Sequence, residues 1–422
     1  MSLSLSLYAA ATTCAAPGLR WMLRRRLRSG REIATRLPER RGLDASPRPE
    51  GRLIWLHAAS VGETISVLPV LSALAADGAF VLMTTGTVTS AGLLARRLAE
   101  LGLEGRVFHR FVPLDVPAWV ARFLDRWRPD AAGFVENEIW PNTIEACRRR
   151  GVPMMLINAR LSPHSFAHWR WAPGLARELL GAFRLVQAQS AGDAGRLAAL
   201  GAQQVSAPGN LKFAAPELPV DLETLARLQN LIGARPVWLA ASTHPGEEAI
   251  AAVVHASLAA RLPGLLTIIV PRHPERGAML AAELGATRRA LGADPPAGGG
   301  LWLGDTMGEM GLYCRLAQAV FVGKSLTGQG GQNPLEPARL GRPVAVGPHT
   351  GNFREPVAAL HEAGALTEVA DVAALTAWVE AMLTDPRAAA AAGEAGRVAA
   401  ARTAALPAQV AARLLELADA RP

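Results

Sequence analysis

The segment between residues 321 and 336 reads Phe321-Val-Gly-Lys-Ser-Leu-Thr-Gly-Gln-Gly-Gly-Gln-Asn-Pro-Leu-Glu336 and continues a short apolar run. The run predicts a strand and the glycines a loop, after which Asn333 can cap a helix with Pro334 as its first residue and Glu336 as its third. Glycines let a backbone approach a ligand closely, and the N–H groups at a helix start attract phosphate. The segment therefore predicts a nucleotide-binding loop in which Glu336 accepts hydrogen bonds from ribose hydroxyls. For Glu336 alone, a capping box is an equally good explanation.

Apolar runs that alternate with helical patterns extend over most of the chain. Seven such runs occur between residues 51 and 209, and the alternation restarts at residue 237 with five more. This alternation predicts parallel sheets covered by helices, so the fold class is α/β with two Rossmann-like, doubly wound domains. Strands are predicted at 53–57, 80–84, 107–112, 131–135, 154–157, 185–188, 205–207, 237–241, 265–270, 301–303, 319–322 and 343–346.

The length of the chain, 422 residues, is too great for one typical domain. We expect an apolar segment with an arginine-rich arm at 1–41, a first domain at 42–213, a linker at 214–235, a second domain at 236–383 and a helical tail at 384–422. Two consecutive domains of this kind place a cleft where the carboxyl ends of both sheets can face one ligand. The three cysteines lie far apart in the chain, which indicates a reducing compartment and no disulfide framework.

The positive charge of the chain is concentrated near its N-terminus. Residues 20–41 hold nine arginines and two glutamates, which accounts for +7 of the net charge of +8. The nearly neutral remainder argues against a nucleic-acid-binding face. An apolar segment at 3–19 precedes the arginines; it is short for a membrane span, and the order is the reverse of a secretory signal. We expect a membrane-surface anchor, or one short span with the arginines on the cytoplasmic side, and a disordered basic tail is the alternative.

Charged residues follow several predicted strands of the first domain. Glu63 begins a helix whose dipole favours an ionised carboxylate, and such a group could act as general base on an alcohol; helix stabilisation alone is the commoner explanation. The fourth strand leads into Glu136 and Glu138, which would share one side if the strand continued, and strand-end capping explains them as well. Lys212 and Lys324 are the only lysines among 44 basic residues, which suggests positions that need a compact ammonium group.

Polar loops occur at comparable places in the second domain. The segments 241–248, 270–276 and 304–309 each follow a predicted strand and supply histidine, arginine or glutamate. With the loop at 323–336 they predict phosphate and ribose sites along one sheet edge. The chain contains no Walker A sequence, no Gly-x-Gly-x-x-Gly after a strand, no Asp-x-Asp triplet and no Cys/His pair with zinc spacing. This pattern favours transfer from a nucleotide-activated donor without a metal ion or cofactor.

With these segments in place, the chain resembles the bacterial 3-deoxy-D-manno-octulosonic acid (Kdo) transferases of lipopolysaccharide synthesis over nearly its whole length. The resemblance rests on 60–63, 136–142, 158–162, 211–213, 242–248, 270–276, 304–309, 333–336 and 347–353. It implies the GT-B architecture and transfer of Kdo from CMP-Kdo, with inversion, to the 6′-hydroxyl of the lipid A precursor, lipid IVA. It also implies that the N-terminal segment anchors the enzyme to the cytoplasmic face of the inner membrane.

The resemblance assigns roles to individual residues. Glu63 maps onto the family's general base, and Glu136 and Lys212 onto residues that support the transition state. The CMP site is implied to comprise Pro271, Arg272, His273, Met307, Gly308, Glu309, Asn333, Pro334, Leu335 and Glu336. Arg272 and the amides of the loop are expected to stabilise the departing phosphate.

Two residues depart from the family's usual pattern within the glycine-rich loop. Gln332 stands where the family has a histidine, and Lys324 stands where it has a small residue, so the Lys324 ammonium is a candidate for supplying the missing charge.

Two other classes of function stay open. A nucleotide-sugar epimerase would need no membrane arm, and a catalytically silent carbohydrate-binding membrane protein would need no carboxylate at Glu63.

Overall fold

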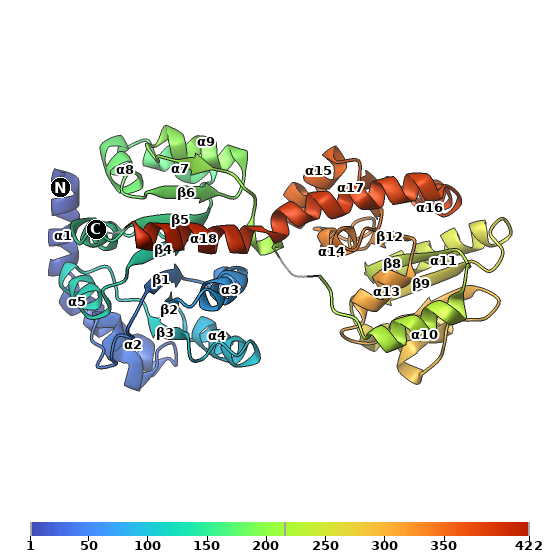
Figure 1. The fold of residues 1–422 in the computed structure, drawn as a ribbon, viewed down its shortest axis with the longest axis horizontal. Coiled ribbons are helices and arrows are strands. Elements are labelled where there is room, and N and C mark those ends of the chain that lie inside the picture. The colour runs from blue at the N-terminus through green and yellow to red at the C-terminus, as the bar shows by residue number, and fades with distance from the viewer. Residues whose placement is uncertain (1, 215–216, 421–422) are drawn as a thin grey trace. The chain divides into compact units, whose positions relative to one another are not determined.

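The computed structural model describes residues 2–214 and 217–420 and divides into two compact units (Figure 1). The first unit comprises residues 1–215 and 403–422, and the second comprises residues 216–402. The expected arm and the end of the expected tail therefore belong to the first unit instead of forming separate parts. Within the expected linker, residues 215–216 lie outside the described residues, as do residue 1 of the arm and residues 421–422 of the tail.

The first unit is built on a seven-stranded parallel sheet with the order β3-β2-β1-β4-β5-β6-β7. Its strands are β1 (Leu53–Ala58), β2 (Phe80–Thr85), β3 (Val107–Phe111), β4 (Ala131–Val135), β5 (Met154–Ala159), β6 (Leu185–Ala188) and β7 (Val205–Ser206). Its helices are α1 (Leu3–Cys14), α2 (Ala16–Arg28), η1 (Ala34–Arg41), α3 (Val61–Ala76), α4 (Val88–Glu100), α5 (Pro117–Trp127), α6 (Pro141–Arg149), α7 (Pro163–Trp169), α8 (Pro173–Leu180), α9 (Ala191–Ala199), η2 (Leu211–Phe213) and α18 (Leu406–Asp419). The strand order reverses between β1 and β4, the kind of position at which open α/β sheets bind ligands.

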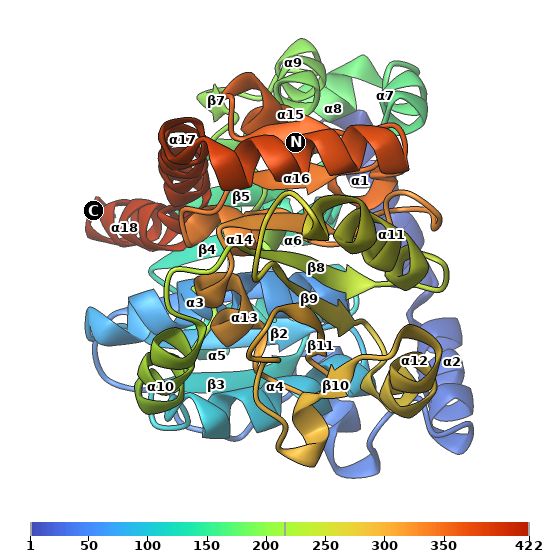
Figure 2. The same cartoon turned by 90° about the vertical axis from the view of Figure 1, so that its right-hand side faces the viewer.

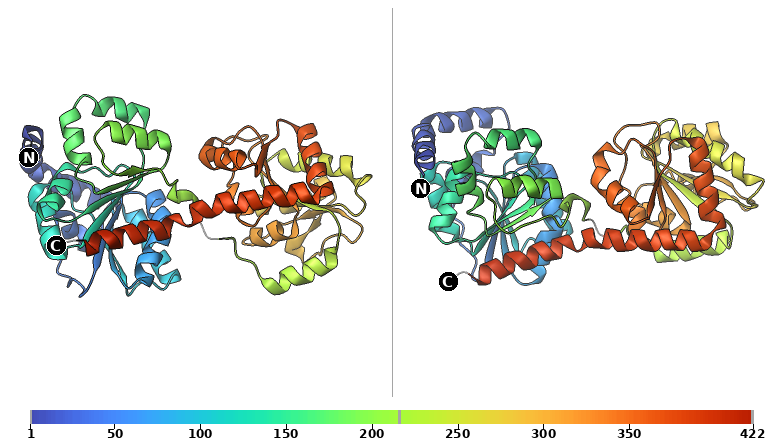
Figure 3. Two further views of the ribbon diagram at one scale, coloured as in Figure 1. Left: turned by 45° about the horizontal axis from the view of Figure 1, so that its top comes forward. Right: turned by 90° about the horizontal axis from the view of Figure 1, so that it is seen from above.

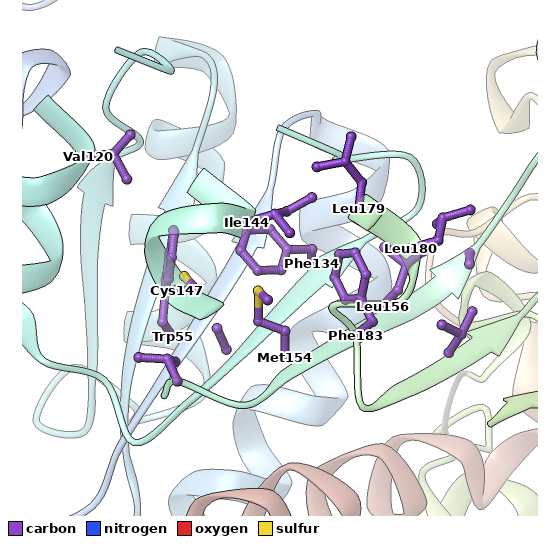
Figure 4. Packing of buried hydrophobic residues seen from close by; sticks show 14 of the residues in the cluster. Trp55, Val120, Phe134, Ile144, Cys147, Met154, Leu156, Leu179, Leu180 and Phe183 are labelled. Carbon is purple, nitrogen blue, oxygen red and sulfur yellow. The ribbon is translucent and has the colours of Figure 1, made fainter. Parts of the chain in front are cut away.

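Continuous apolar strands form the core of this unit because both faces of the sheet are covered by helices. Trp55 and Phe134 pack edge to face with ring centroids 5.1 Å apart, and Phe183 packs on Phe134 at 6.0 Å (Figure 4). The other face is covered partly by α18, whose Val410 and Leu414 join the core cluster that also contains Leu56 of β1. The last helix of the chain thus completes the core of the first unit.

The N-terminal segment forms two helices that pack on the first unit. Leu5 of α1 is buried in the core, and Leu23 of α2 packs against Val116 and Trp119. Figure 3 shows these two helices, in dark blue, beside the rest of the first unit. Within residues 2–214 and 217–420, no helix combines the length and the apolar character that crossing a bilayer requires. The expectation of one short span is therefore not met.

The second unit repeats the architecture with a parallel sheet of seven strands in the order β10-β11-β9-β8-β12-β13-β14. Its strands are β8 (Val237–Thr243), β9 (Leu266–Pro271), β10 (Thr287–Arg288), β11 (Gly300–Leu303), β12 (Ala319–Val322), β13 (Val344–Val346) and β14 (Leu366–Glu368). Its helices are α10 (Leu222–Ile232), α11 (Glu247–Ala259), η3 (Pro274–Arg276), α12 (Gly277–Leu284), η4 (Arg289–Leu291), α13 (Met310–Leu316), α14 (Leu335–Arg339), η5 (Gly351–Phe353), α15 (Arg354–Glu362), α16 (Val372–Thr384) and α17 (Pro386–Ala404). Figure 2 shows α11 and α12 on one side of this sheet and α10 and α13 on the other.

The predicted strands agree with the structure in order and position, but two further strands were not predicted. All twelve are present, with ends shifted by at most two residues. The prediction missed β10 and β14, which are the two edge strands of the second sheet and are only two and three residues long. Both are largely exposed and polar, so neither carries the apolar signal on which the prediction depended.

Candidate active site

Glu63 lies in the first turn of α3, at the carboxyl end of β1, where it closes a capping box. Its Oε1 accepts a hydrogen bond from the Ser60 hydroxyl at 2.6 Å, and its Oε2 accepts one from the amide of Ala59 at 2.7 Å. The Ser60 hydroxyl oxygen in turn accepts a hydrogen bond from the Glu63 amide at 3.3 Å. Each carboxylate oxygen can accept more than one hydrogen bond, so this arrangement leaves capacity for a proton from a substrate hydroxyl. The structural explanation for Glu63 and its predicted catalytic role are therefore compatible.

Glu136 and Lys212 form an ion pair at the same edge of the sheet. The Lys212 ammonium lies 2.5 Å from Glu136 Oε1. β4 ends at Val135, and Glu136 adopts a positive φ of 60°, so the chain turns there instead of continuing as a strand. Glu138 consequently points elsewhere: its Oε2 lies 3.2 Å from Nε2 of His57, so the two glutamates have different partners.

Lys212 is held in place by a network of side-chain amides, of which Asn158 lies in one of the segments that the resemblance included and Gln189 lies in none of them. Asn158 Oδ1 accepts a hydrogen bond from the amide of Leu211 at 2.9 Å, and Gln189 Nε2 donates to the Asn158 carbonyl at 3.0 Å. Asn210 completes the network by donating to Gln189 Oε1 at 3.1 Å. These bonds fix the short turn η2 that presents Lys212 to Glu136.

Non-glycine residues with a left-handed backbone mark the strand ends of both units. In the first unit, those at the carboxyl ends of strands are Glu136 and Asn158, after or within the neighbouring strands β4 and β5, with φ of 60° and 54°. In the second unit they are Ser242 and Lys324, at the ends of the neighbouring strands β8 and β12, with φ of 52° and 59°. Such conformations cost about 1–3 kcal/mol each and occur preferentially at functional sites.

A pocket of about 130 Å³ lies at the carboxyl edge of the second sheet. Three predicted donor-site residues line it, namely Arg272, Asn333 and Glu336. The remaining lining residues are Ala241, Ser242, Met310, Cys314, Val322, Gln332 and Pro337. Of these, Ser242 belongs to the polar loop 241–248 that the sequence already indicated, but its left-handed backbone, with a φ of 52°, could not be predicted from the sequence.

Glu336 is a half-buried carboxylate within this pocket. Burial raises the pKa of Glu336 above its ordinary value, although the hydrogen bond from Asn333 and the charges of Arg339 and Arg272 oppose the increase. Asn333 Nδ2 lies 3.3 Å from Glu336 Oε1, and Asn333 Oδ1 accepts the amide of Leu335 at 3.1 Å. The helix α14 begins at Leu335, so Pro334 occupies the cap position, one residue later than predicted.

Glu247 occupies amides of the glycine-rich loop that we expected to face phosphate. Its carboxylate is 1% exposed and accepts hydrogen bonds from the amides of Lys324, Ser325 and Leu326 at 2.6–3.1 Å. It also accepts the amide of His244 at 2.9 Å. The expectation fails at residues 324–326 because a carboxylate of the protein already neutralises these donors.

The remaining predicted donor residues lie around the pocket rather than along its lining. Pro271 ends β9, His273 follows it, and Pro334 and Leu335 are buried at the start of α14. Met307 is exposed, and Gly308 adopts a φ of 84° that favours glycine. Hydrogen bonding to Arg289 lowers the pKa of Glu309, whose carboxylate also accepts bonds from Thr306 and Tyr313.

Gln332 and Lys324, the two departures from the family pattern, both lie near His244. Gln332 Nε2 lies 3.2 Å from His244 Nε2. Burial lowers the pKa of His244, and the positive charge of Lys324 lowers it further. In the described part of the chain, no three His, Cys, Asp or Glu side chains are grouped in a way that could hold a metal ion.

Solved structures place this fold in the class of two-unit, GT-B-like proteins that includes glycosyltransferases and nucleotide-sugar epimerases. A glycosyltransferase from Rickettsia africae is similar with a TM-score of 0.55 at 13% identity, covering 87% of this chain and 100% of that chain. The UDP-GlcNAc 2-epimerase from Neisseria meningitidis, bound to UDP-GlcNAc, is similar with a TM-score of 0.55 at 15% identity over the same shares. At these identities the likeness shows the fold alone.

Sequence comparison identifies the family. The family model described as 3-deoxy-D-manno-octulosonic-acid transferase (kdotransferase) matches residues 35–215. The 3-deoxy-D-manno-octulosonic acid transferase of Bordetella pertussis is 35% identical over 388 residues, covering 89% of this chain and 90% of the relative. The transferase of the same name from Haemophilus influenzae is 37% identical, covering 82% and 83%. The chain belongs to the 3-deoxy-D-manno-octulosonic acid transferase family, as the sequence motifs predicted.

Proposed function

We propose that this protein is a metal-independent, inverting transferase that moves Kdo from CMP-Kdo to the 6′-hydroxyl of lipid IVA. The similarity to the Bordetella pertussis transferase over 89% of the chain is the observation that carries the proposal. Two features support it: Glu63 lies at the carboxyl edge of the first unit's sheet, and a polar pocket lies at the carboxyl edge of the second unit's sheet.

The proposed chemistry is a single displacement at the anomeric carbon of Kdo. Glu63 accepts the proton of the acceptor hydroxyl as its oxygen forms the new glycosidic bond, and the bond from the anomeric carbon to the CMP phosphate breaks with its electron pair leaving on the phosphate. Attack opposite the leaving group inverts the configuration. Lys212, paired with Glu136, adds positive charge where the acceptor edge meets the transferred sugar.

On the donor side, Glu336 accepts hydrogen bonds from the ribose and Arg272 neutralises the departing phosphate. Arg272 is exposed at the pocket, and its charge is close enough to Glu336 to affect the pKa of that carboxyl. Because Glu247 engages the amides of residues 324–326, Arg272 carries more of the phosphate stabilisation than the sequence suggested.

We also propose that α2 docks the enzyme on the cytoplasmic face of the inner membrane. Trp21 is exposed, and five arginines near it are exposed as well: Arg20, Arg24, Arg25, Arg28 and Arg31. By contrast, Arg40 is buried against Glu32 at 3.0 Å, so this part of the arm serves the fold. Replacing Arg20, Arg24 and Arg25 with Gln should reduce co-sedimentation with anionic vesicles, and unchanged binding would exclude this surface.

One assay distinguishes the proposed function from the two alternatives. The protein is incubated with CMP-Kdo and lipid IVA in detergent with EDTA, and wild type is compared with Glu63→Ala. We expect transfer by wild type only. Loss of wild-type transfer on adding EDTA would contradict metal independence. Consumption of CMP-Kdo without an acceptor would indicate a different reaction, and no turnover by either protein would indicate a binding protein.

A further inference from the structure

A chain of hydrogen bonds connects the core of the first unit to a tryptophan on its surface. His57, in the interior strand β1, is 1% exposed, and its Nδ1 lies 3.0 Å from the hydroxyl oxygen of Thr84. Its other nitrogen, Nε2, lies 3.2 Å from Glu138 Oε2. The same carboxylate oxygen accepts the indole N–H of Trp140 at 2.5 Å. The orientation of the exposed Trp140 ring is thus fixed by Glu138, which is itself held by His57 within the sheet.

The charge state of Glu138 supports this arrangement. Burial alone would raise the pKa of Glu138, but the hydrogen bond and charge of His57 and the hydrogen bond from Trp140 outweigh it and lower the pKa below its ordinary value. An ionised carboxylate is a stronger acceptor than a neutral group, so the bond that holds the indole is charge-assisted.

The N–H edge of the Trp140 indole is fixed by this hydrogen bond, while the rest of the ring stays accessible to solvent. The residue is 43% exposed even though its N–H is satisfied within the protein. A large apolar side chain that is already held in one orientation loses little conformational entropy when a ligand covers it. The fixed hydrogen bond therefore favours a binding role over an incidental exposure.

The position of Trp140 associates it with the predicted acceptor residues. It ends the loop that begins with Glu136, and this loop joins β4 to α6. β4 lies beside β1 in the sheet (Figure 1), and the chain continues from β1 directly to Glu63. The bond between His57 and Glu138 thus links the strand that precedes Glu63 to the loop that carries Glu136 and Trp140.

We propose that the Trp140 ring is a stacking platform for a pyranose ring of the sugar acceptor, with Glu138 and His57 as positioning residues. The C–H face of a pyranose is apolar, and an indole covers it while its polar edge stays hydrogen-bonded. This inference rests on the proposed transferase function, because it assigns the acceptor subsite of that reaction.

The test measures KM for acceptor and donor separately in Trp140→Ala and Trp140→Phe. Trp140→Ala should raise the acceptor KM about tenfold, which is about 1.4 kcal/mol of lost binding, while the KM for CMP-Kdo and the affinity for CMP stay unchanged. Trp140→Phe should recover most of the loss, since it keeps an aromatic face. Glu138→Ala should give a smaller increase, because it frees the ring without removing it. Trp171→Ala is the matched control: Trp171 is 89% exposed elsewhere in the same unit and should change neither KM.

The outcomes separate this inference from the proposed function. An acceptor KM that stays unchanged in Trp140→Ala, with wild-type transfer intact, overturns the inference alone. A parallel loss of CMP affinity in Trp140→Ala would indicate general misfolding and would also overturn the inference. The inference would fail as well if the rise in acceptor KM disappeared with a deacylated, water-soluble acceptor, because the ring would then contact acyl chains and not a sugar. Absence of transfer by wild type overturns the proposed function, and the inference falls with it.

Discussion

Glu63 and Glu247 occupy comparable places in the two units, yet their carboxylates have different partners. Each lies in the first turn of the helix that follows the first strand of its unit, β1 or β8, which lies inside the sheet with neighbours on both sides. Among the described residues, the Glu63 carboxylate accepts hydrogen bonds from Ala59 and Ser60, just before α3, and the residue is 9% exposed. Glu247 is 1% exposed and reaches amides 77–79 residues away, in the loop after β12.

This difference shows that one architectural position can serve either chemistry or structure. A carboxylate with local partners leaves the neighbouring strand ends free to bring other groups to it. A carboxylate that bridges two strand-end loops accepts hydrogen bonds from backbone amides and has little capacity left for a substrate. It fixes instead the shape of the loops around the predicted CMP pocket. We therefore expect the two residues to respond oppositely to substitution.

Glu63→Gln should abolish most of the transferase activity with little effect on folding. A general base typically contributes about 10²–10⁴-fold, and Gln keeps the capping geometry while losing basicity. The measurement is kcat for Kdo transfer alongside thermal unfolding. Asp371→Ala is the control, because it removes the cap of α16 and should cost about 1 kcal/mol in stability while leaving kcat unchanged. Retained activity in Glu63→Gln would show that Glu63 is not the general base and that, like Glu247, it serves the structure.

Glu247→Ala should destabilise the second unit by roughly 3 kcal/mol or more and lower CMP affinity. The substitution leaves the amides of His244, Lys324, Ser325 and Leu326 without their charged acceptor, and each buried unpaired donor costs about 1–3 kcal/mol. Denaturant unfolding and CMP titration measure the two effects. Glu394→Ala, which removes an exposed pair with Arg397, should change neither. Normal stability in Glu247→Ala would show that water replaces the carboxylate.

The sequence predicted local features of both sites and missed those that depend on distant contacts. Glu63 could be placed at the start of a helix from the local sequence, and apolar runs are sufficient to predict buried parallel strands. The bonds from Glu247 to the glycine-rich loop and the amide network behind Lys212 join segments that come together only in the folded sheet. Arg272, Asn333 and Glu336 could be placed at one pocket because carboxyl ends of parallel strands share an edge.

The pH dependence of CMP binding should distinguish Glu336 from the other carboxylates. The pKa of Glu336 is raised in the free protein, and ribose hydroxyls that donate to it favour its ionised form. CMP affinity should therefore be full above this pKa and fall by up to about tenfold per pH unit below it, since a proton must be released on binding. Isothermal titration at several pH values tests this, and Glu336→Gln should bind weakly with no such dependence. An equally steep pH profile in Glu336→Gln would assign the proton to another group.

Lys324→Ala should have the smallest effect, a rise of about two- to fivefold in the KM for CMP-Kdo, because one partly exposed cation is lost from the donor edge. Lys324 adopts a φ of 59°, so Lys324→Gly should raise KM equally while sparing the backbone strain that Ala retains. Loss of this charge should also raise the pKa of His244, which an NMR titration of the imidazole measures. If KM stays constant while the pKa of His244 rises, Lys324 acts on the histidine and not on the donor. In that case Lys324 does not replace the charge of the histidine that the family carries at Gln332, and Arg272 supplies the positive charge for the departing phosphate without help from Lys324.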